Sequence, residues 1–258
     1  MKLSLRSLRR VGAVLVALAA LAGIATPLLA LNITPVIVDL SSTGRRTSAV
    51  ISLQNTFAEA VPVEVSAHPV RVVNGELVES EEEEAKDLLV FPAQATVEGG
   101  QTQAFRVQWV GEPAPKASEH FYVTVSQLPV TLPGNQNAIQ VLHRFKVLVS
   151  VGAPDAKAEL RIDKADIQPD ENGKPRPVIT VSNGGNTYGY LGQRELTIVQ
   201  RAPDGREVFR RSFSPDLIQR QMGLGLVPSG QTRVLPVNLP LPQADGTLSV
   251  ELGAATSS

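Results

Sequence analysis

In Val61-Pro62-Val63-Glu64-Val65, valine occupies every second position. Side chains of an extended strand point alternately to its two faces, so the three valines share one face and predict a half-buried strand. Pro62 lacks an amide hydrogen and places this strand at an edge or near its own start. Similar alternation marks four further runs, at Ser48–Leu53, Phe105–Val110, Phe121–Leu128 and Ile139–Val151. Short alternating runs separated by Gly, Pro, Asn and Asp predict an all-β sandwich fold.

The chain has 258 residues, which suits two domains of about 100 to 130 residues each. Alternation stops at Val151-Gly152-Ala153-Pro154-Asp155 and resumes near Glu159. We therefore predict a first domain over 31–151, a linker over 152–156, a second domain over 157–253 and a tail over 254–258. The strands expected in the second domain are Glu159–Ile162, Val178–Ser182, Glu195–Gln200, Glu207–Phe213, Thr232–Leu239 and Thr247–Glu251.

Residues 1–30 have the pattern of a secretory signal peptide, because a basic start precedes a long apolar run, Val11–Ala25. Gly and Pro residues interrupt the apolar stretch, which is short for a membrane span, so we expect cleavage rather than an uncleaved anchor. Cleavage after Ala30 is favoured because the strand pattern begins directly afterwards, and Ala25 is the alternative. The mature chain is expected to leave the cytoplasm and to have no stable insertion in a membrane.

The composition argues against several classes of function. A formal net charge of -1 and a pI of about 6.3 give no basic footprint for nucleic acid. The chain has no cysteine, which excludes thiol nucleophiles and disulfide support. His68, His120 and His143 lie in or beside different strand runs without zinc-binding spacing, and we interpret each as a sheet-face or interface side chain. We predict no catalytic residue, no metal site and no cofactor.

Acidic residues are concentrated in Glu79–Glu84, a run that only Ser80 interrupts. Like charges at this density repel one another and stay solvated, so we expect an exposed loop with at most one helical turn. A calcium site is the alternative interpretation. The run lacks the alternating ligands and the turn glycine that calcium loops use, which disfavours that alternative.

The most unusual segment is the predicted strand Ile139–Val151. One of its faces carries an apolar side chain at nearly every position, with His143 as the only polar member. At about 13 residues the strand is more than twice the usual length, so one end is expected to present apolar side chains outward. One interpretation is a long core strand that runs on into the linker. The other is that the row completes the sheet of another protein by β-strand addition.

Several shorter motifs occur in a consistent order along the chain. They are Ile33-Thr34-Pro35-Val36, Ser52-Leu53-Gln54-Asn55, Phe91-Pro92, Gly99–Val107, Glu119–Pro129, Val181–Asn186 and Val227–Gly230. In this order, behind a signal peptide, they resemble the PapD-like periplasmic chaperones of the chaperone-usher pilus pathway. The resemblance covers about Leu31 to Gly253, and the strand from Ile139 follows where that family's donor strand would be.

The resemblance implies two immunoglobulin-like domains in an L-shaped (boomerang) arrangement, a periplasmic location and no enzymatic activity. The implied function is to bind, stabilise and deliver pilin or fimbrial subunits to an outer-membrane usher by donor-strand complementation. By position, the donated side chains would be Ile139, Val141, His143 and Phe145, and the imidazole would need a polar partner when buried. A self-dimer of the unloaded chaperone is a further partner to consider.

In the family, a basic pair in the cleft between the domains grips the subunit's terminal carboxylate, a charge-assisted contact. Here Pro35 occupies the position expected to be Arg, and Leu148 aligns with the position expected to be Lys. Lys146, two residues earlier on the same face, is a candidate substitute, and Arg144 is the other candidate. These departures indicate a divergent branch of the family.

Two other functions remain open on the sequence. The chain could be a structural or adhesive β-sandwich protein of the fibre itself, although residues 31–40 are too short and strand-like for a donor extension. A periplasmic sandwich enzyme would need a convergent acid and base pair, and none stands out. The sequence leaves open which pilin and usher are the partners, the donor-strand register, the anchoring basic residue and the oligomeric state.

Overall fold

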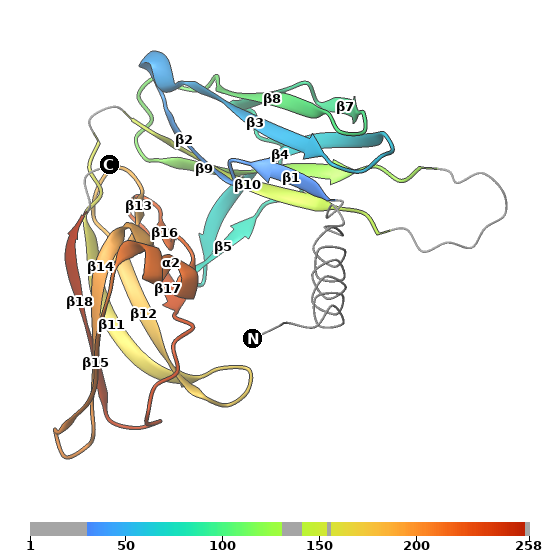
Figure 1. The fold of residues 1–258 in the computed structure, drawn as a ribbon. Helices are drawn as coiled ribbons and strands as arrows, with labels where there is room; N and C mark the ends of the chain where they lie inside the picture. The colour runs from blue at the N-terminus through green and yellow to red at the C-terminus, as the bar shows by residue number, and fades with distance from the viewer. Residues whose placement is uncertain (1–29, 131–140, 154–155, 256–258) are drawn as a thin grey trace, which may run out of the picture.

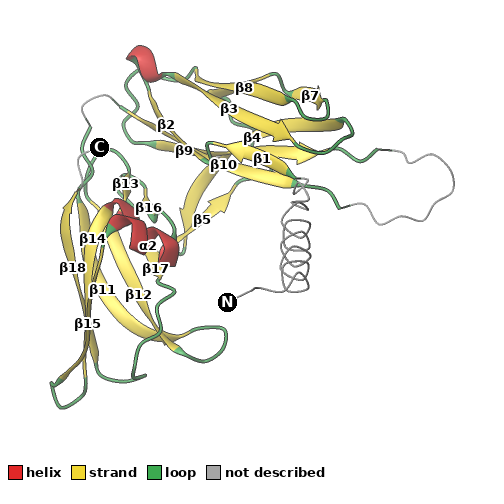
Figure 2. Ribbon diagram, in the orientation of Figure 1, coloured by secondary structure: helices red, strands yellow, loops and turns green. Residues whose placement is uncertain are grey.

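The computed structural model describes residues 30–130, 141–153 and 156–255. Figure 1 shows two β-sandwiches set at an angle to each other, and Figure 2 shows that strands make up most of both. The all-β, two-domain architecture predicted from the sequence is confirmed. The expected signal peptide, Ile139 and the last residues of the expected tail lie outside the described ranges. No helix within those ranges has the length and apolar character that crossing a membrane requires.

The first domain is a sandwich of two sheets. One sheet has the strand order β1-β3-β8-β6, and the other has the order β2-β10-β9-β4-β5, with β7 also paired to β4. Neighbouring strands are antiparallel except β2 and β10, which run parallel. The elements are β1 Leu31–Thr34, β2 Ile37–Ser41, η1 Gly44–Arg46, β3 Ser48–Asn55, β4 Val61–Val73, β5 Glu76–Glu79, β6 Leu88–Phe91, β7 Gln94–Val97, β8 Thr102–Trp109, β9 Glu119–Gln127 and β10 Arg144–Gly152.

The core of this domain lies between the inward faces of the two sheets. Val61, Val63 and Val65 of β4 are all buried, as their alternation predicted. Pro62 lies near the start of β4, opposite the short strand β7. Other fully buried members of the core are Ile51, Leu53, Phe105, Val107, Val123, Val147, Val149 and Val151. Because burial of each such side chain contributes about 1.5–3 kcal/mol, this core supports the domain without cross-links.

The second domain contains smaller sheets with the orders β11-β12-β17, β15-β14-β18 and β13-β16. Helix α2 begins with a proline in its first turn, ends at Gly223 and buries Ile218 against the core. The elements are β11 Leu160–Pro169, β12 Pro175–Asn183, β13 Gly189–Tyr190, η2 Leu191–Gln193, β14 Arg194–Arg201, β15 Glu207–Phe213, α2 Pro215–Met222, β16 Leu226–Val227, β17 Thr232–Pro236 and β18 Thr247–Ala255.

Each domain has a buried asparagine at the end of a strand. Asn55 closes β3, and its Nδ2 donates to the carbonyl oxygens of Glu59 (2.8 Å) and Val97 (2.9 Å). Its Oδ1 accepts from the backbone N–H of Phe57 at 2.9 Å, which forms an Asx turn. Asn183 at the end of β12 repeats the arrangement, with Nδ2 donating to two carbonyl oxygens at 2.7 and 3.0 Å. These side chains fix the loops that follow the two strands.

We expect Asn55→Ala to lower the free energy of unfolding by about 2–4 kcal/mol, because it leaves two carbonyl oxygens of a buried loop without their donor. Urea titration followed by circular dichroism measures the change. Gln54→Ala, at the exposed neighbouring position, is the control and should change stability by about 0.5 kcal/mol or less. Equal stability of the two variants would contradict the role assigned to Asn55.

Candidate functional site

The chain changes from one sheet to the other between β1 and β2. β1 pairs with β3, whereas β2 pairs with β10 from Leu148 opposite Ile37 to Gly152 opposite Ser41. The N–H of Leu148 also donates to the carbonyl oxygen of Val36 at 3.1 Å. Within the described part of the chain, residues 144–147 of β10 therefore have no strand on the side away from β9. Unpaired backbone groups at such an edge can accept another strand.

The side chains of β10 change from buried to exposed toward this open edge. Val147, Val149 and Val151 are fully buried in the first core, and Phe145 packs against that core while half-buried. Val141, which alternation assigns to the same row, is 72% exposed. The expectation that one end of the row presents apolar side chains outward is confirmed for Val141. Part of the row is therefore available to a partner.

The strand itself is shorter than the sequence predicted. We expected it to begin at Ile139, but β10 begins at Arg144, and residues 141–143 are not extended into the ladder. The N–H of Gln127, the last residue of β9, donates to the carbonyl oxygen of His143 at 2.9 Å, and the next N–H donates to β4 instead. Because the neighbouring strand turns away here, Val141 and Leu142 have no ladder to join. The register of a donated strand stays a prediction.

His143 has the polar partner that a half-buried imidazole requires. Gln127 Oε1 lies 3.0 Å from His143 Nδ1 and accepts from the His143 backbone N–H at 3.3 Å. A backbone N–H only donates, so Gln127 presents its oxygen here, and Nδ1 is the donor in the contact with the ring. The ring stacks on Phe145 with 6.1 Å between centroids and lies 6.0 Å from the ring of Phe57. These three rings form an aromatic rim at the open end of the core.

The two candidate anchor residues lie on the other face of β10, and both contact the acidic run. Lys146 Nζ donates to Glu79 Oε2 and lies 5.6 Å from the centre of the Tyr122 ring. Arg144 Nη2 lies 3.7 Å from Glu81 Oε1. The structure thus brings Arg144 and Lys146 together with carboxylates of the same chain. Which of the two would hold a subunit carboxylate stays a prediction.

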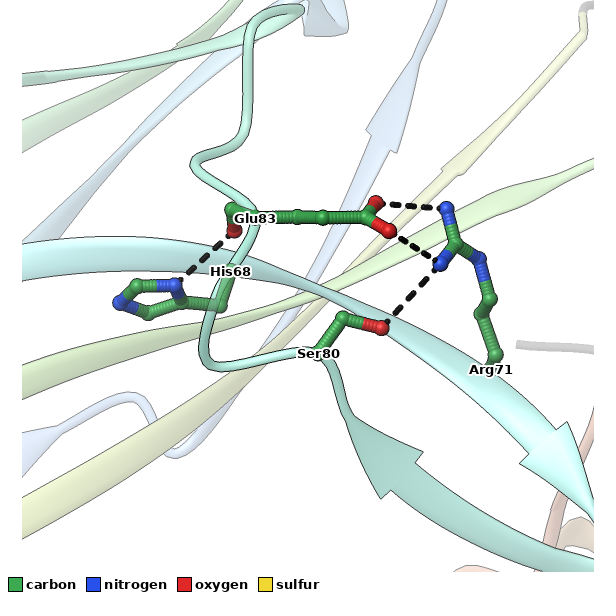
Figure 3. Close-up of polar contacts among 4 residues, drawn as sticks. All are labelled: His68, Arg71, Ser80 and Glu83. Atoms are coloured by element: carbon green, nitrogen blue, oxygen red, sulfur yellow. Dashed lines mark hydrogen bonds and ion pairs between the residues drawn. The ribbon is translucent and has the colours of Figure 1, made fainter.

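A third pair joins Arg71 of β4 to Glu83, as Figure 3 shows. The two terminal nitrogens of Arg71 donate to the two carboxylate oxygens of Glu83 at 2.8 and 2.7 Å, and Arg71 Nη1 also donates to Ser80 Oγ at 3.3 Å. His68 Nδ1 lies 3.0 Å from the Glu83 carbonyl oxygen. The Arg71 guanidinium, by its hydrogen bond and then its charge, lowers the pKa of the Glu83 carboxyl. This bidentate geometry orders the loop after β5.

The expectation of an exposed acidic loop is confirmed for Glu81–Glu84 and is wrong for Glu79. Glu79 belongs to β5, and Glu79, Glu81 and Glu83 each pair with a basic side chain of the sheet. Opposite charge on the neighbouring strands outweighs the mutual repulsion that the run would have in isolation. Among the residues with described positions, no group of three or more His, Cys, Asp or Glu could hold a metal ion.

The tip of the β4–β5 hairpin docks on the second domain. Asn74 and Gly75 form a two-residue turn with φ of 52° and 83°, the pattern of a type I′ hairpin. The Gly75 carbonyl oxygen accepts from Arg233 Nε at 2.8 Å and from the Val234 N–H at 3.0 Å. A Cβ atom on Gly75 would lie 2.7 Å from Val234 Cγ2. Only glycine fits both the turn and this contact.

A second joint between the domains is a polar cluster in which His120, Ser150 and Tyr190 are buried and Asp39 is exposed. Asp39 of β2 accepts hydrogen bonds from the Tyr188 hydroxyl at 2.8 Å and from the Tyr190 hydroxyl at 2.7 Å. The ring of Tyr188 packs edge-on against His120, with centroids 5.3 Å apart. His120 Nδ1 in turn lies 2.9 Å from Ser150 Oγ. The prediction that His120 is an interface side chain is confirmed.

Burial sets the protonation of this cluster. It lowers the pKa of His120 to about 3. Burial first, and then the negative charge of Asp39, raise the pKa of Tyr188 and of Tyr190. At neutral pH the cluster therefore contains a neutral imidazole and two neutral phenols beside one carboxylate.

A cleft of about 780 Å³ lies between the domains, lined by residues that include Arg71, Glu83, His120 and Ser229. The Ser229 N–H donates to Ser118 Oγ at 3.3 Å across the domain boundary. A second hollow of about 650 Å³ is lined by residues that include Asp39 and Tyr188. The paired basic residues and both contacts with the second domain lie on the outward face of the sheet that contains β10. The open edge of β10 borders this face.

Sequence reasoning missed both joints. The Asn74-Gly75 dipeptide between apolar runs is a hairpin signal and could have located the β4–β5 hairpin. Arg233, Asp39 and Tyr190 carry no local signal, because their partners lie far away in the sequence.

Comparisons with known proteins identify the fold. Residues 29–151 match the family described as the pili and flagellar-assembly chaperone, PapD N-terminal domain. No curated protein sequence matched the chain. Three similar solved structures share the two-domain fold at low identity. One is a chaperone–tip adhesin complex of CFA/I fimbriae, with 13% identity and a TM-score of 0.50, covering 88% of this chain and 100% of that one. Another is the CsuC–CsuE chaperone–tip adhesion subunit pre-assembly complex of the archaic chaperone-usher Csu pili of Acinetobacter baumannii, with 12% identity and a TM-score of 0.51, covering 86% of this chain and 97% of that one. The third is the YadV chaperone, with 13% identity and a TM-score of 0.50, covering 86% of this chain and 91% of that one.

The fold, the open edge and the family match agree with one another. Residues 29–151 match the PapD N-terminal domain family, and the whole chain has the two-domain fold of these chaperone structures.

We expect Gly75→Ala to loosen the joint between the domains, because the added Cβ meets Val234 and strains a left-handed turn. Small-angle X-ray scattering should show a larger radius of gyration than that of the wild type. Gly205→Ala is the control, because Gly205 has φ of 85° in the hairpin between β14 and β15 with nothing within 4 Å of its Cβ position. It should lower stability by about 1 kcal/mol without changing the radius. An unchanged radius for Gly75→Ala would contradict the docking role.

We expect His120 to make stability fall as the pH is lowered from about 6.5 toward 3. The unfolded imidazole takes up a proton near pH 6.5, whereas the folded one, with a pKa of about 3, does not. Between pH 7 and pH 5 the wild type should therefore lose about 2 kcal/mol more stability than His120→Gln. Urea unfolding at the two pH values measures this difference, in which the carboxylates common to both proteins cancel. Equal losses for the two proteins would contradict the neutral, buried state of His120.

Proposed function

We propose that this chain is a non-catalytic periplasmic chaperone of the chaperone-usher type, which captures pilus subunits by lending them the open edge of β10. The observation that carries the proposal is the row of unpaired backbone groups over 144–147, next to the exposed Val141. A chain of a solved chaperone–tip adhesin complex shares this two-domain fold, and residues 29–151 match a pilus-assembly family.

The backbone of β10 supplies the affinity in this proposal. β9 pairs with one side of Arg144–Val147 through a regular antiparallel ladder, which holds the strand extended. An extended, preorganised edge loses little conformational freedom when a second strand adds to its open side. A subunit sandwich that lacks a strand would gain main-chain hydrogen bonds there.

The apolar row provides side chains that would be buried in the groove of a subunit. Val141 is largely exposed and Phe145 is half-buried, so each has area left to bury against a partner. Full burial of a side chain of this size contributes about 1.5–3 kcal/mol. Ile139 extends the proposed row, and His143 contributes its stacked ring with Gln127 as its polar partner.

The basic residues supply the register. We propose Lys146 as the residue that holds the subunit's terminal carboxylate, with Arg144 as the second candidate. Both project from the face of β10 opposite the core, beside the open edge, where a bound strand would end. Delivery of the captured subunit to an outer-membrane usher completes the proposed role, and neither a cofactor nor a metal takes part.

The test is co-expression of the tagged chain with fibre subunits encoded beside it, followed by mass spectrometry of whatever is retained. We expect the wild type to retain a subunit and Val141→Glu to retain at least tenfold less, because a carboxylate cannot be buried in an apolar groove without a partner. Val141 lies outside the core, so this change should leave the thermal unfolding transition in place.

Val50→Glu is the matched control, because Val50 is a 52% exposed valine on the outward face of the other sheet. It should retain as much subunit as the wild type. Equal retention by Val141→Glu and Val50→Glu would refute strand donation. Retention of a sugar or a metal by the wild type, and of no fibre-like subunit, would refute the chaperone assignment as a whole.

A further inference from the structure

The pairing of Lys146 with Glu79 is unlike the other ion pairs of the acidic run. The Glu79 side chain is only 5% exposed, whereas those of Glu81 and Glu83 are 62% and 51% exposed. Lys146 Nζ donates to Glu79 Oε2, and Glu79 Oε1 is buried without a hydrogen-bond partner in the described structure. A half-satisfied buried carboxylate is unfavourable unless its one cation stays in place. Lys146 is therefore committed to a carboxylate of its own chain.

In the described structure, the other basic side chains that pair with the acidic run are also occupied. Arg144 is 3.7 Å from Glu81, and Arg71 forms a bidentate pair with Glu83. A terminal carboxylate arriving at Lys146 would therefore meet Glu79 at close range, and the repulsion between the two carboxylates favours displacement of one of them.

The position of Glu79 allows it to leave. It is the last residue of β5, a strand that pairs on one side only, with Val70–Val73 of β4. None of the four β5 side chains belongs to the buried core. A movement of Glu79 away from Lys146 would therefore break no core packing.

We propose that Glu79 is an internal placeholder for the subunit's terminal carboxylate: it occupies Lys146 in the unloaded chaperone and is displaced when a subunit binds. This inference rests on the proposed function. The placeholder keeps Lys146 neutralised and oriented while the site is empty, and the exchange of one carboxylate for another leaves the charge at Lys146 unchanged. Subunit binding is then weaker than a free ammonium would give, because each binding event has to displace Glu79.

The test compares variants in competition for one subunit. Wild type and a variant, carrying tags of different mass, are co-expressed with a limiting amount of the subunit that the wild type retains, and native mass spectrometry gives the ratio of the two complexes. Glu79→Gln keeps the size and the acceptor oxygen but removes the charge. We expect it to be enriched about tenfold over the wild type in the complex, and Lys146→Met to be depleted about tenfold.

Two controls separate displacement from a general charge effect. Glu82→Gln removes the same charge from the same run, and Glu82 forms none of the ion pairs described above; it should stay within twofold of the wild type. The double variant Glu79→Gln/Lys146→Met should show no gain over Lys146→Met, because the gain requires the ammonium. Circular dichroism of each variant confirms that the fold is kept.

The outcomes distinguish this inference from the proposed function. Failure of the wild type to retain any subunit refutes both. Retention by the wild type, with Glu79→Gln equal to it or depleted, or with Glu82→Gln enriched as strongly as Glu79→Gln, overturns the placeholder and leaves strand donation standing. A gain in the double variant over Lys146→Met also overturns it.

Discussion

The backbone hydrogen-bonding groups of β10 are divided between two neighbours of unequal length. β9 pairs along Arg144–Val151, whereas β2 pairs only along Leu148–Gly152. The division falls where the chain crosses between sheets at Pro35, a residue that has no N–H to offer a ladder. The half of β10 from Leu148 onward is therefore paired on both sides, and the half before it is an edge, although Val147 in that edge is still buried in the core.

On the outward face of the sheet that contains β10, basic side chains pair with the acidic run, although the whole chain is nearly neutral. The exposed pairs of Arg71 and Arg144 contribute little to stability on their own, because solvent screens them. Their effect is to order the segment after β5 over the outward face of the sheet. The pair of Lys146 and Glu79 differs, because the carboxylate is buried and loss of its cation would leave an uncompensated charge. The Lys146–Glu79 pair therefore stabilises this face but weakens its binding of another anion.

How much the sequence predicted depends on whether a constraint is local. Alternation located β3, β4, β8 and β9, because burial of one sheet face leaves a period of two in the sequence. The same rule placed the start of β10 too early, because alternation continues to Ile139 while a strand also needs a neighbour, and β9 ends at Gln127. The partners of the acidic run and the bonds from Tyr188 and Tyr190 to Asp39 join residues far apart in the chain, and periodicity carries no information about them. Gly75 was within reach, since its turn type is local even though its contact with Val234 is not.

The β4–β5 hairpin connects the joint and the ion pair. Its tip, Gly75, is bonded to the second domain, and β5 ends at Glu79 beside Lys146. At about 3.3 Å per residue, these two contacts are separated by only about 13 Å of paired strand. A strand this short, held in register by β4, cannot move at one end without moving at the other. Gly75 and Glu79 lie at the two ends of this short segment, so the contact with the second domain and the position of the Glu79 carboxylate are set by the same few residues.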